Sequence, residues 1–309
     1  MKFFARVPNI DFMSQRKVGL TASTLLTLGA ILLVLVRGLN LGIDFTGGVL
    51  VEVQYPQTVE LDSVRSNLAE AGYERAVVQY FGASTAVLIR LPPAEDASSA
   101  QVSTNILHAL NAEQNGISLR RIEFVGPQVG DELAEKGGLA LLFAFMGIMI
   151  YIAFRFEWKF SVGAIAALIH DAVMVLGLLS LLQVEFDITT LAAILALIGY
   201  SNNETIVIFD RVRENLINQR KGDVLDIVNL SVNQTLLRSV ITHLTTLLVL
   251  VALFFLGGSS VNSFSIAMIF GVIVATYSSI YVSTNLAVAL GVSREDLLPS
   301  QDKEIDELP

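Results

Sequence analysis

Six apolar stretches, each about as long as a bilayer crossing, constrain the fold of this chain more than any other feature. A helix needs about 20 mostly apolar residues to cross the hydrocarbon layer, because its backbone polar groups must be satisfied within the segment. The stretches cover residues 18–36, 138–154, 161–182, 188–209, 237–256 and 264–290. The sequence therefore predicts a polytopic α-helical membrane protein with six transmembrane helices.

The composition agrees with this fold class and excludes several functions. Of the 309 residues, 53% are hydrophobic and 16% are charged, whereas soluble domains carry about 25% charged residues. The net charge of −9 leaves no basic patch that would indicate nucleic-acid binding. The chain has no cysteine, no phosphate-binding G-x-x-x-x-G-K-[ST] loop and no H-E-x-x-H zinc motif among its 3 histidines. We expect no metal, no cofactor and no enzymatic activity.

Lysine and arginine residues near the ends of the apolar stretches predict the orientation, because cytoplasmic loops carry an excess of both. They occur before residue 18, at Arg155 and Lys159, between residues 211 and 221, and at Arg294. The opposite loops, residues 183–187 and 257–262, contain none, and Arg37 is the exception. Both termini are therefore expected in the cytoplasm, with residues 38–135 on the outer side of the membrane.

The predicted outer segment, residues 38–135, has its own pattern of strands and helices. Strands are expected at residues 49–55, 75–81, 85–91 and 119–125, and helices at 59–71 and 100–111. The order β-α-β-β-α-β is that of a ferredoxin-like domain. We thus expect four parts: residues 1–37, the α+β domain at 38–135, a bundle at 136–293 and an acidic tail at 294–309.

Glu204 is the first polar residue in the spans that points to a function. It lies in the run "IGYSNNETIVIFDR", beside Asn203, about six residues from the cytoplasmic end of the fourth span. Polar groups in a span can be interhelical glue, but a buried carboxylate is costly and can exchange a proton. Glu204 is therefore a candidate proton carrier.

Arg238 opens the fifth span, and two interpretations of it remain open. Its side chain can reach the depth of Glu204 or extend to the cytoplasmic surface. Thr242, Thr245 and Thr246 continue a polar stripe on its side of the helix, which favours a face turned to protein or water. His243 departs from this stripe, and we expect it to be a packing or hydrogen-bonded histidine.

His170 and Asp171 lie at the middle of the third span, where burial of a charge is most costly. They are either structural hydrogen-bonding groups or part of a proton relay, and the sequence does not decide between the two. We include both among the candidate proton-coupling residues.

Several motifs in order along the chain now indicate a family. They are "GIDFTGG" (residues 42–48), "RIEFVGPQVG" (121–130), "FRFEW" (154–158), "IHD" (169–171), "IGYS" (198–201), "FDRVREN" (209–215) and "TLLRSVIT" (235–242). With six spans and one outer loop after the first, the chain resembles the SecF family of the bacterial Sec protein-export machinery, within the resistance–nodulation–division (RND) superfamily. The motif residues of the first two segments are Asp44, Phe45, Gly47, Gly48, Gly126 and Pro127.

The resemblance implies partners, a location and a mechanism. SecF-like proteins act in the bacterial inner membrane, which implies that residues 38–135 lie in the periplasm. They act with SecD, and SecD and SecF together associate with the SecYEG channel. SecD and SecF use the proton gradient to aid export of an unfolded polypeptide. The family's Asp and Arg implicated in proton movement match Glu204 and Arg238 here. The expected mechanism is that protonation of Glu204 weakens its pairing with Arg238. Asn203, Asp171, His170, Thr242 and Thr246 complete the predicted site.

Two other functions are weighed against this one. A stand-alone proton-coupled transporter of small molecules is the alternative, since RND relatives export solutes. Such pumps fuse two outer domains and two six-span units, whereas this chain has one of each. An intramembrane enzyme would need a nucleophile or an aspartyl pair, and Asp171 and Glu204 differ in depth by several residues, so this function is least favoured.

Overall fold

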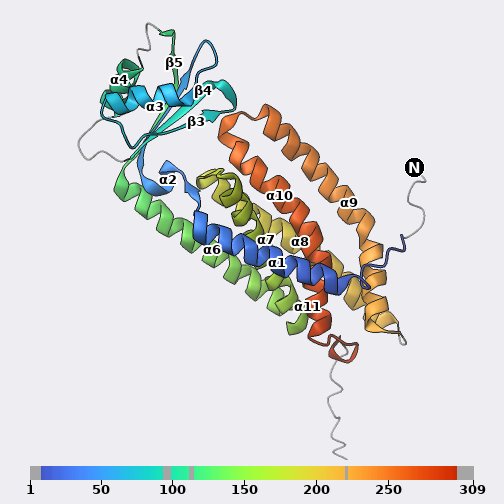
Figure 1. Ribbon diagram of the computed structural model, residues 1–309. Coiled ribbons are helices and arrows are strands. Elements are labelled where there is room, and N and C mark those ends of the chain that lie inside the picture. Colours follow the sequence, from blue (N-terminus) through green and yellow to red (C-terminus); the bar gives the residue numbers. More distant parts are fainter. Residues whose placement is uncertain (1–7, 93–98, 111–114, 220–221, 298–309) are drawn as a thin grey trace, which may run out of the picture.

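The computed structural model describes residues 8–92, 99–110, 115–219 and 222–297. It has two parts, an elongated bundle of helices and a small α/β domain at one end of it (Figure 1). The described ends of the chain both lie near the end of the bundle that is far from this domain.

Six long helical segments form the bundle, and each is long and apolar enough to cross a membrane. They are α1 (Arg16–Arg37), α6 (Pro127–Arg155), α7 (Trp158–Leu182), α8 (Ile188–Asn218), α9 (Val224–Leu256), and α10 (Asn262–Ser278) continued by the π-helical turn η2 (Ser279–Ser283) and α11 (Thr284–Ala289). All six predicted spans are confirmed. The structure adds polar helical turns beyond the apolar stretches, because a helix does not have to end where the hydrocarbon does.

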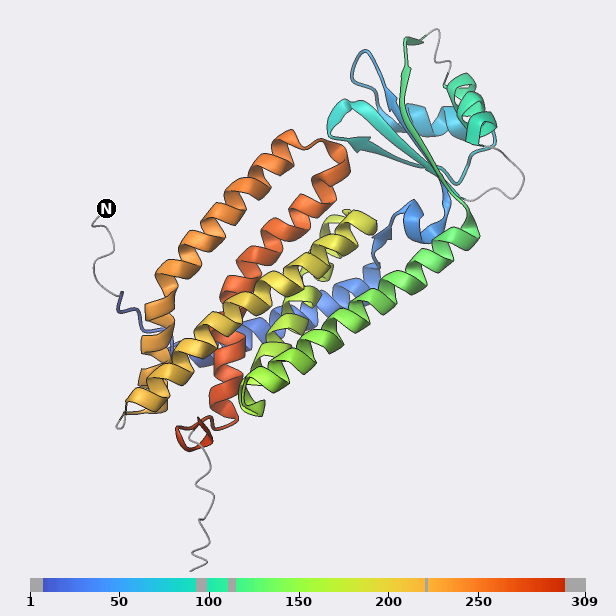
Figure 2. The same cartoon turned by 180° about the vertical axis from the view of Figure 1, so that it is seen from behind.

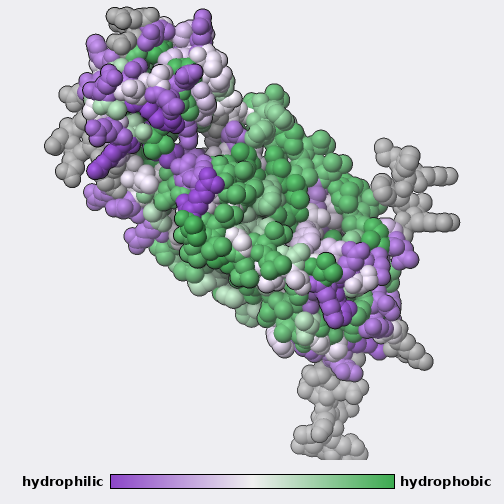
Figure 3. Space-filling view, in the orientation of Figure 1, coloured by the Kyte–Doolittle hydropathy of each residue, from purple (hydrophilic) through white to green (hydrophobic). Residues whose placement is uncertain are grey.

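The helices divide into an inner and an outer group. In α7, α8 and the α10–α11 segment, 50–61% of the most apolar window is buried, against 11%, 6% and 17% in α1, α6 and α9. Helices α8 and α10 pack against each other and lie between α7 and α9. The outer helices present an apolar surface that runs along the bundle, with hydrophilic residues at its two ends (Figure 3). This distribution fits a bundle that crosses a bilayer.

Small residues allow the closest helix contacts. A Cβ on Gly177 of α7 would lie 2.4 Å from the Cβ of Ala30 on α1. On the same helix, a Cβ on Gly163 would lie 2.5 Å from the carbonyl oxygen of Ser283, in the π-helical turn. Without a hydrophobic effect between helices in lipid, such close packing is a main source of association.

The α/β domain has the fold expected from the sequence. Its elements are β2 (Gly48–Gln54), α3 (Leu61–Glu70), β3 (Val77–Phe81), β4 (Ala83–Leu91), α4 (Ser99–Ala109) and β5 (Ser118–Val125). The four strands pair in the order β3-β4-β2-β5, all antiparallel, which is the ferredoxin-like order. Residue 111, the expected end of the second helix, lies outside the described residues.

The hydrophobic core of the domain lies between the sheet and its two helices. It includes Val51, Val53, Leu68, Ile89 and Ile106, all fully buried. Alternation along β2 and β4 sends every second side chain to this core. The opposite face of the sheet is turned to the bundle, as the view from behind also shows (Figure 2).

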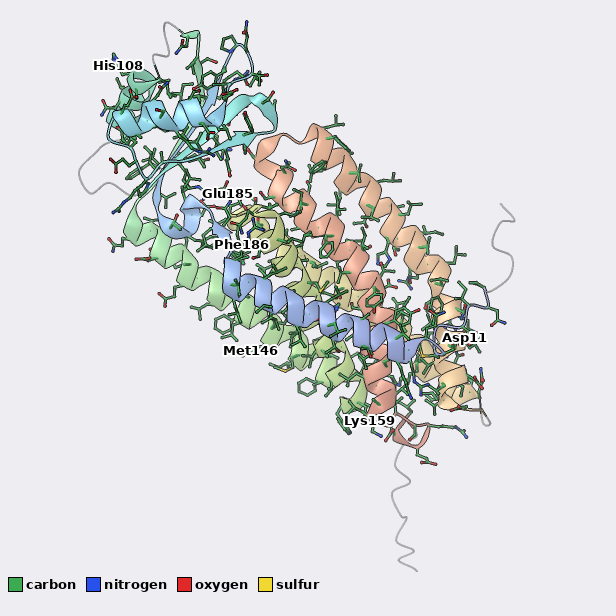
Figure 4. The ribbon with its side chains drawn as sticks, viewed as in Figure 1. Asp11, His108, Met146, Lys159, Glu185 and Phe186 are labelled. Carbon is green, nitrogen blue, oxygen red and sulfur yellow. The ribbon has the colours of Figure 1, made fainter. Side chains whose placement is uncertain are left out.

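A short seam joins the domain to the loop between α7 and α8. Strand β1 (Asn40–Leu41) pairs in parallel with β6 (Glu185–Phe186), whose side chains lie at the junction of the two parts (Figure 4). Arg90 of β4 forms an ion pair with Glu185 (Nη2–Oε1 2.8 Å) and donates to the carbonyl oxygen of Leu41. Burial raises the pKa of Glu185, and the Arg90 charge opposes this shift. The outer domain is thus tied to the start of α8.

Candidate functional site

The polar run of α8 is divided between two faces of the helix. Ser201, Asn202 and Glu204 are buried, whereas Asn203 is exposed. Successive residues of an α-helix point about 100° apart, so neighbours in sequence do not share a face. Asn203, which the sequence places beside Glu204, therefore points away from the bundle interior.

Glu204 of α8 faces α9 and is only 7% exposed. Its Oε1 accepts a hydrogen bond from Ser239 Oγ of α9. Its Oε2 lies 3.8 Å from Nε2 of His243, which follows Ser239 by one turn of α9. One hydroxyl donor is little compensation for the cost of burying a charged carboxylate.

His243 has a defined orientation. Its Nδ1 lies 3.0 Å from Thr276 Oγ1 of α10, and its ring lies against Tyr200 (centroids 5.4 Å apart). Thr276 Oγ1 also lies 2.9 Å from the carbonyl oxygen of Val272. If Thr276 donates to that carbonyl oxygen, it accepts from the Nδ1–H of His243, and Nε2 of the neutral ring has a lone pair towards Glu204. If Thr276 donates to Nδ1 instead, the imidazole proton is on Nε2, on the side of Glu204.

The expected pairing of Glu204 with Arg238 is not formed. Among the described residues Arg238 makes no ion pair, and its side chain is exposed on the outer side of α9. Ser239, the next residue, takes the place beside Glu204. Thr242 is exposed and Thr246 half-buried, and both donate their hydroxyl protons to carbonyl oxygens of their own helix. Arg238 and the threonine stripe thus lie on a face that is open in the single chain.

Asp171 forms a second cluster, between α7, α8 and α10. Its Oδ2 accepts from Ser201 Oγ (2.5 Å) and from Ser278 Oγ (2.8 Å), and its Oδ1 lies 2.9 Å from His170 Nδ1. Asp171 is 1% exposed. These three contacts give both carboxylate oxygens a partner. The π-helical turn begins at the residue after Ser278, a position typical of functional sites.

The residues of the glycine-rich motif lie at the seam, not in the bundle. Asp44 Oδ2 accepts from the backbone N–H of Ile188 (3.0 Å), at the N-terminus of α8. Gly48 has φ +123°, and a Cβ there would lie 2.3 Å from the carbonyl oxygen of Leu91. A Cβ on Gly130 of α6 would lie 2.7 Å from the backbone nitrogen of Gly47. These glycines are needed because backbone segments meet there without room for a side chain.

The remaining motif residues connect the same elements. Phe45 packs against Phe186, with ring centroids 5.5 Å apart. Gly126 precedes α6, and Pro127 is its first residue, where the missing N–H costs no helical hydrogen bond. Among the residues that the structure describes, no group of three or more histidine or acidic side chains is arranged to hold a metal ion.

Comparison with known proteins identifies the family. Residues 105–293 match the family model "Protein export membrane protein SecD/SecF, C-terminal", and residues 32–59 match the "SecD/SecF GG Motif". The chain belongs to the SecD/SecF family. The protein translocase subunit SecF of Pseudomonas aeruginosa is 47% identical over 98% of this chain and 99% of its own length. SecF of Escherichia coli O157:H7 is 43% identical over 93% and 90%.

The fold is also that of a solved member of the SecD/SecF family. The crystal structure of SecDF, a translocon-associated membrane protein from Thermus thermophilus, matches with a TM-score of 0.85 and 40% identity. The match covers 92% of this chain but 39% of SecDF. The crystal structure of SecDF in a super-membrane-facing form matches with a TM-score of 0.69, again over 92% of this chain and 39% of SecDF. The present chain is thus a multi-pass membrane protein whose shape is closer to the first form.

Sequence reasoning missed part of the site. Ser239, Ser278 and Thr276 are ordinary residues in an apolar helix, and nothing in their spacing marks them as partners of a carboxylate. The sequence predicts His243 to be a packing or hydrogen-bonded histidine, and its contact with Thr276 agrees with this, but its place beside Glu204 is not predicted. The signal that could have found it is its distance of four residues from Ser239, which puts both on one face of α9.

Proposed function

We propose that this chain is the SecF-type subunit of a bacterial Sec translocase, acting in the inner membrane with a SecD-type partner to couple proton entry to a late step of protein export. The observation that carries the proposal is Glu204, a carboxylate buried in a span with one hydroxyl donor and one histidine around it. A carboxylate is costly to bury in its charged form, and ionisable residues within spans are therefore candidates for proton relays.

The open face of α9 supports the need for a partner. Arg238 and Thr242 are exposed there, and so are the apolar Leu244, Leu248 and Val249. The chain spans 39% of SecDF, so a second six-span unit is the natural cover for this face. In that assembly Arg238 lies at the interface, where it either meets an acidic group of the partner or turns towards Glu204 when the carboxylate is charged.

The seam supplies a route from the bundle to the outer domain. Protonation of Glu204 removes a charge from the contact between α8 and α9 and lets the two helices shift. Helix α8 begins at Ile188, whose N–H is held by Asp44, and β6 just before it is held by Arg90 through Glu185. A movement of α8 is thereby passed to the sheet, and the domain reorients on the periplasmic side. One proton crossing the membrane supplies about 2.3 kcal/mol per 100 mV, enough to bias two states more than tenfold.

The test replaces Glu204 by Gln in a cell that also produces the SecD-type partner. We expect proton flux and export of a secreted reporter to be lost, while Glu204→Asp retains part of both. The matched control is Glu214→Gln, on the same helix, because the Glu214 side chain is 55% exposed and pairs only with Arg211 three residues away. Undiminished export and flux in Glu204→Gln would overturn the proposal.

A stand-alone transporter of small molecules is separated from this function by purification. The proposed function predicts that the tagged chain is isolated with a SecD-type subunit and a channel of the SecYEG type. Isolation as an oligomer of this chain alone would favour the transporter. Nothing in the site favours an enzymatic reaction over transport, and the relatives are translocase subunits.

A further inference from the structure

His243 is a buried histidine that the proposed function, as stated, does not use. It is 6% exposed, and its Nε2 has no hydrogen-bond partner among the described residues. Buried nitrogen atoms without a partner are rare in folded proteins, and each needs an explanation. The ring cannot turn freely, because Thr276 holds Nδ1 and Tyr200 lies against one side.

Nε2 of His243 and Oε2 of Glu204 face each other, 3.8 Å apart, and their contact is favourable only when a proton lies between them. Two acceptors that face each other in a dry interior repel, whereas one proton between them turns the contact into a charge-assisted hydrogen bond. The pair is therefore built to hold one proton that either Nε2 or Oε2 can carry.

Among the described residues, the elements packed around His243 bring no carboxylic or basic side chain against its ring besides Glu204. Helix α8 presents Glu204 and Tyr200, α10 presents Thr276, and α9 itself presents Ser239 one turn away. The carboxylate of Asp171 belongs to α7, on the far side of the α8–α10 pair. Glu204 is thus the acidic group that faces this imidazole.

The position of His243 along α9 gives the pair a direction. Helix α9 runs from the end of the bundle that holds the chain termini towards the outer domain (Figure 1). His243 follows Ser239 by four residues, so it lies about 6 Å nearer the outer domain than the hydroxyl that bonds Glu204. A proton that enters from the outer side therefore reaches His243 before Glu204.

We propose that His243 is the residue that receives the proton from the outer side and transfers it to Glu204. This inference rests on the proposed function. In the first step the neutral ring takes up a proton and becomes a cation that carries a proton on both Nδ1 and Nε2. In the second step the N–H bond at Nε2 breaks and an O–H bond forms at Glu204 Oε2, which leaves a neutral imidazole and a neutral carboxylic acid.

The separation of 3.8 Å makes the second step conditional on movement. A hydrogen bond needs about 2.7–3.2 Å between these atoms, so α8 and α9 must approach by roughly 1 Å, or one water molecule must bridge the gap. Because the charged ring and the carboxylate attract each other, protonation of His243 itself favours the approach. Loading of the proton and closure of the two helices are thereby linked.

The test measures proton flux of the full chain with its SecD-type partner in lipid vesicles, at a series of external pH values. In the wild type, flux should rise as the external pH falls into the range where an imidazole is protonated. In His243→Gln we expect flux to fall about a hundredfold and this rise to disappear. The control is His108→Gln, since His108 is exposed on α4 of the outer domain (Figure 4) and should not affect either quantity.

A second variant separates proton transfer from structure. In His243→Ala, added imidazole should restore part of the flux, because the small molecule can fill the vacated position and carry the proton. Wild-type flux and pH dependence in His243→Gln would overturn the inference, and so would a uniform loss with unchanged pH dependence and no rescue. Retained flux in Glu204→Gln as well would instead refute the proposed function.

Discussion

The two buried carboxylates of the bundle, Asp171 and Glu204, have opposite environments although one pair of helices, α8 and α10, contributes to both. Asp171 accepts hydrogen bonds from two serines on different helices and is paired with His170. Glu204 has one serine donor and a histidine 3.8 Å away. A carboxylate with several hydrogen-bond donors is favoured in its charged form, whereas one with few donors is more easily neutralised. We propose that Asp171 anchors the helices and that Glu204 exchanges the proton.

The largest effect expected from this difference is on stability. Asp171→Ala removes the acceptor for Ser201 and Ser278 and leaves their hydroxyl groups buried between three helices. We expect the free energy of unfolding to fall by about 3–5 kcal/mol, as for a broken buried network. Thermal unfolding of the purified chain in detergent measures this loss. A fall no larger than that of Glu204→Ala would break the distinction between the two clusters.

Substitution of the two serines, Ser201 and Ser239, tests the same difference with a smaller expected loss of stability. Ser201→Ala removes a donor to a charged carboxylate, and we expect a loss of about 2 kcal/mol. Ser239→Ala should cost less than about 1 kcal/mol, because the Ser239 hydroxyl is shared with the carbonyl oxygen of Thr235 and Glu204 can be neutral. Unfolding of the two variants under the same conditions compares them. Equal losses would show that both carboxylates depend on their donors to the same degree.

The smallest effects concern two acidic groups outside the spans, one at each end of the bundle. Burial raises the pKa of Glu185 above 4.5, so as the pH falls the folded state takes up this proton before the unfolded state does. Stability should therefore rise as the pH falls towards 4.5, and Glu185→Gln should lack this rise. Melting curves of both proteins across this range measure the difference.

Asp296 serves as the opposite case. Its hydrogen bond with Lys159 lowers its pKa below 3.8, so its contribution is present above that value and is lost only in more acidic solution. The stability difference between the wild type and Asp296→Asn should then stay constant between about pH 7 and about pH 5. A change in that window would show that the contact with Lys159 does not set the behaviour of Asp296.

Much of the fold could be predicted from the sequence, because spans and strands leave regular patterns of apolar residues. Apolar runs predict spans, and the alternation in residues 49–55 and 85–91 predicts strands β2 and β4, whichever residues surround them. The order of these elements was enough for the ferredoxin-like domain. The π-helical turn at Ser279 could not be predicted, since it results from packing against α7.

The site was predicted only in part, because it depends on angles between helices. Glu204 and Asp171 were found from the cost of burial alone. Their partners were not, since Ser239 rather than Arg238 faces Glu204, and one residue along a helix turns a side chain by about 100°. Asn203 is next to Glu204 in the sequence, but the same turn of about 100° places its side chain on the exposed surface of α8.

The most direct test of the account is an infrared difference spectrum of the chain with its partner in lipid, between about pH 8 and about pH 5. The account predicts that the carbonyl band of protonated carboxylic acids, which grows as the pH falls, contains a component that is absent in Glu204→Gln and present in Asp171→Asn. The component due to Glu185, whose pKa is raised by burial, is identified separately with Glu185→Gln. A component that persists in Glu204→Gln and is lost in Asp171→Asn would contradict the account, and would make Asp171 the group that carries the proton.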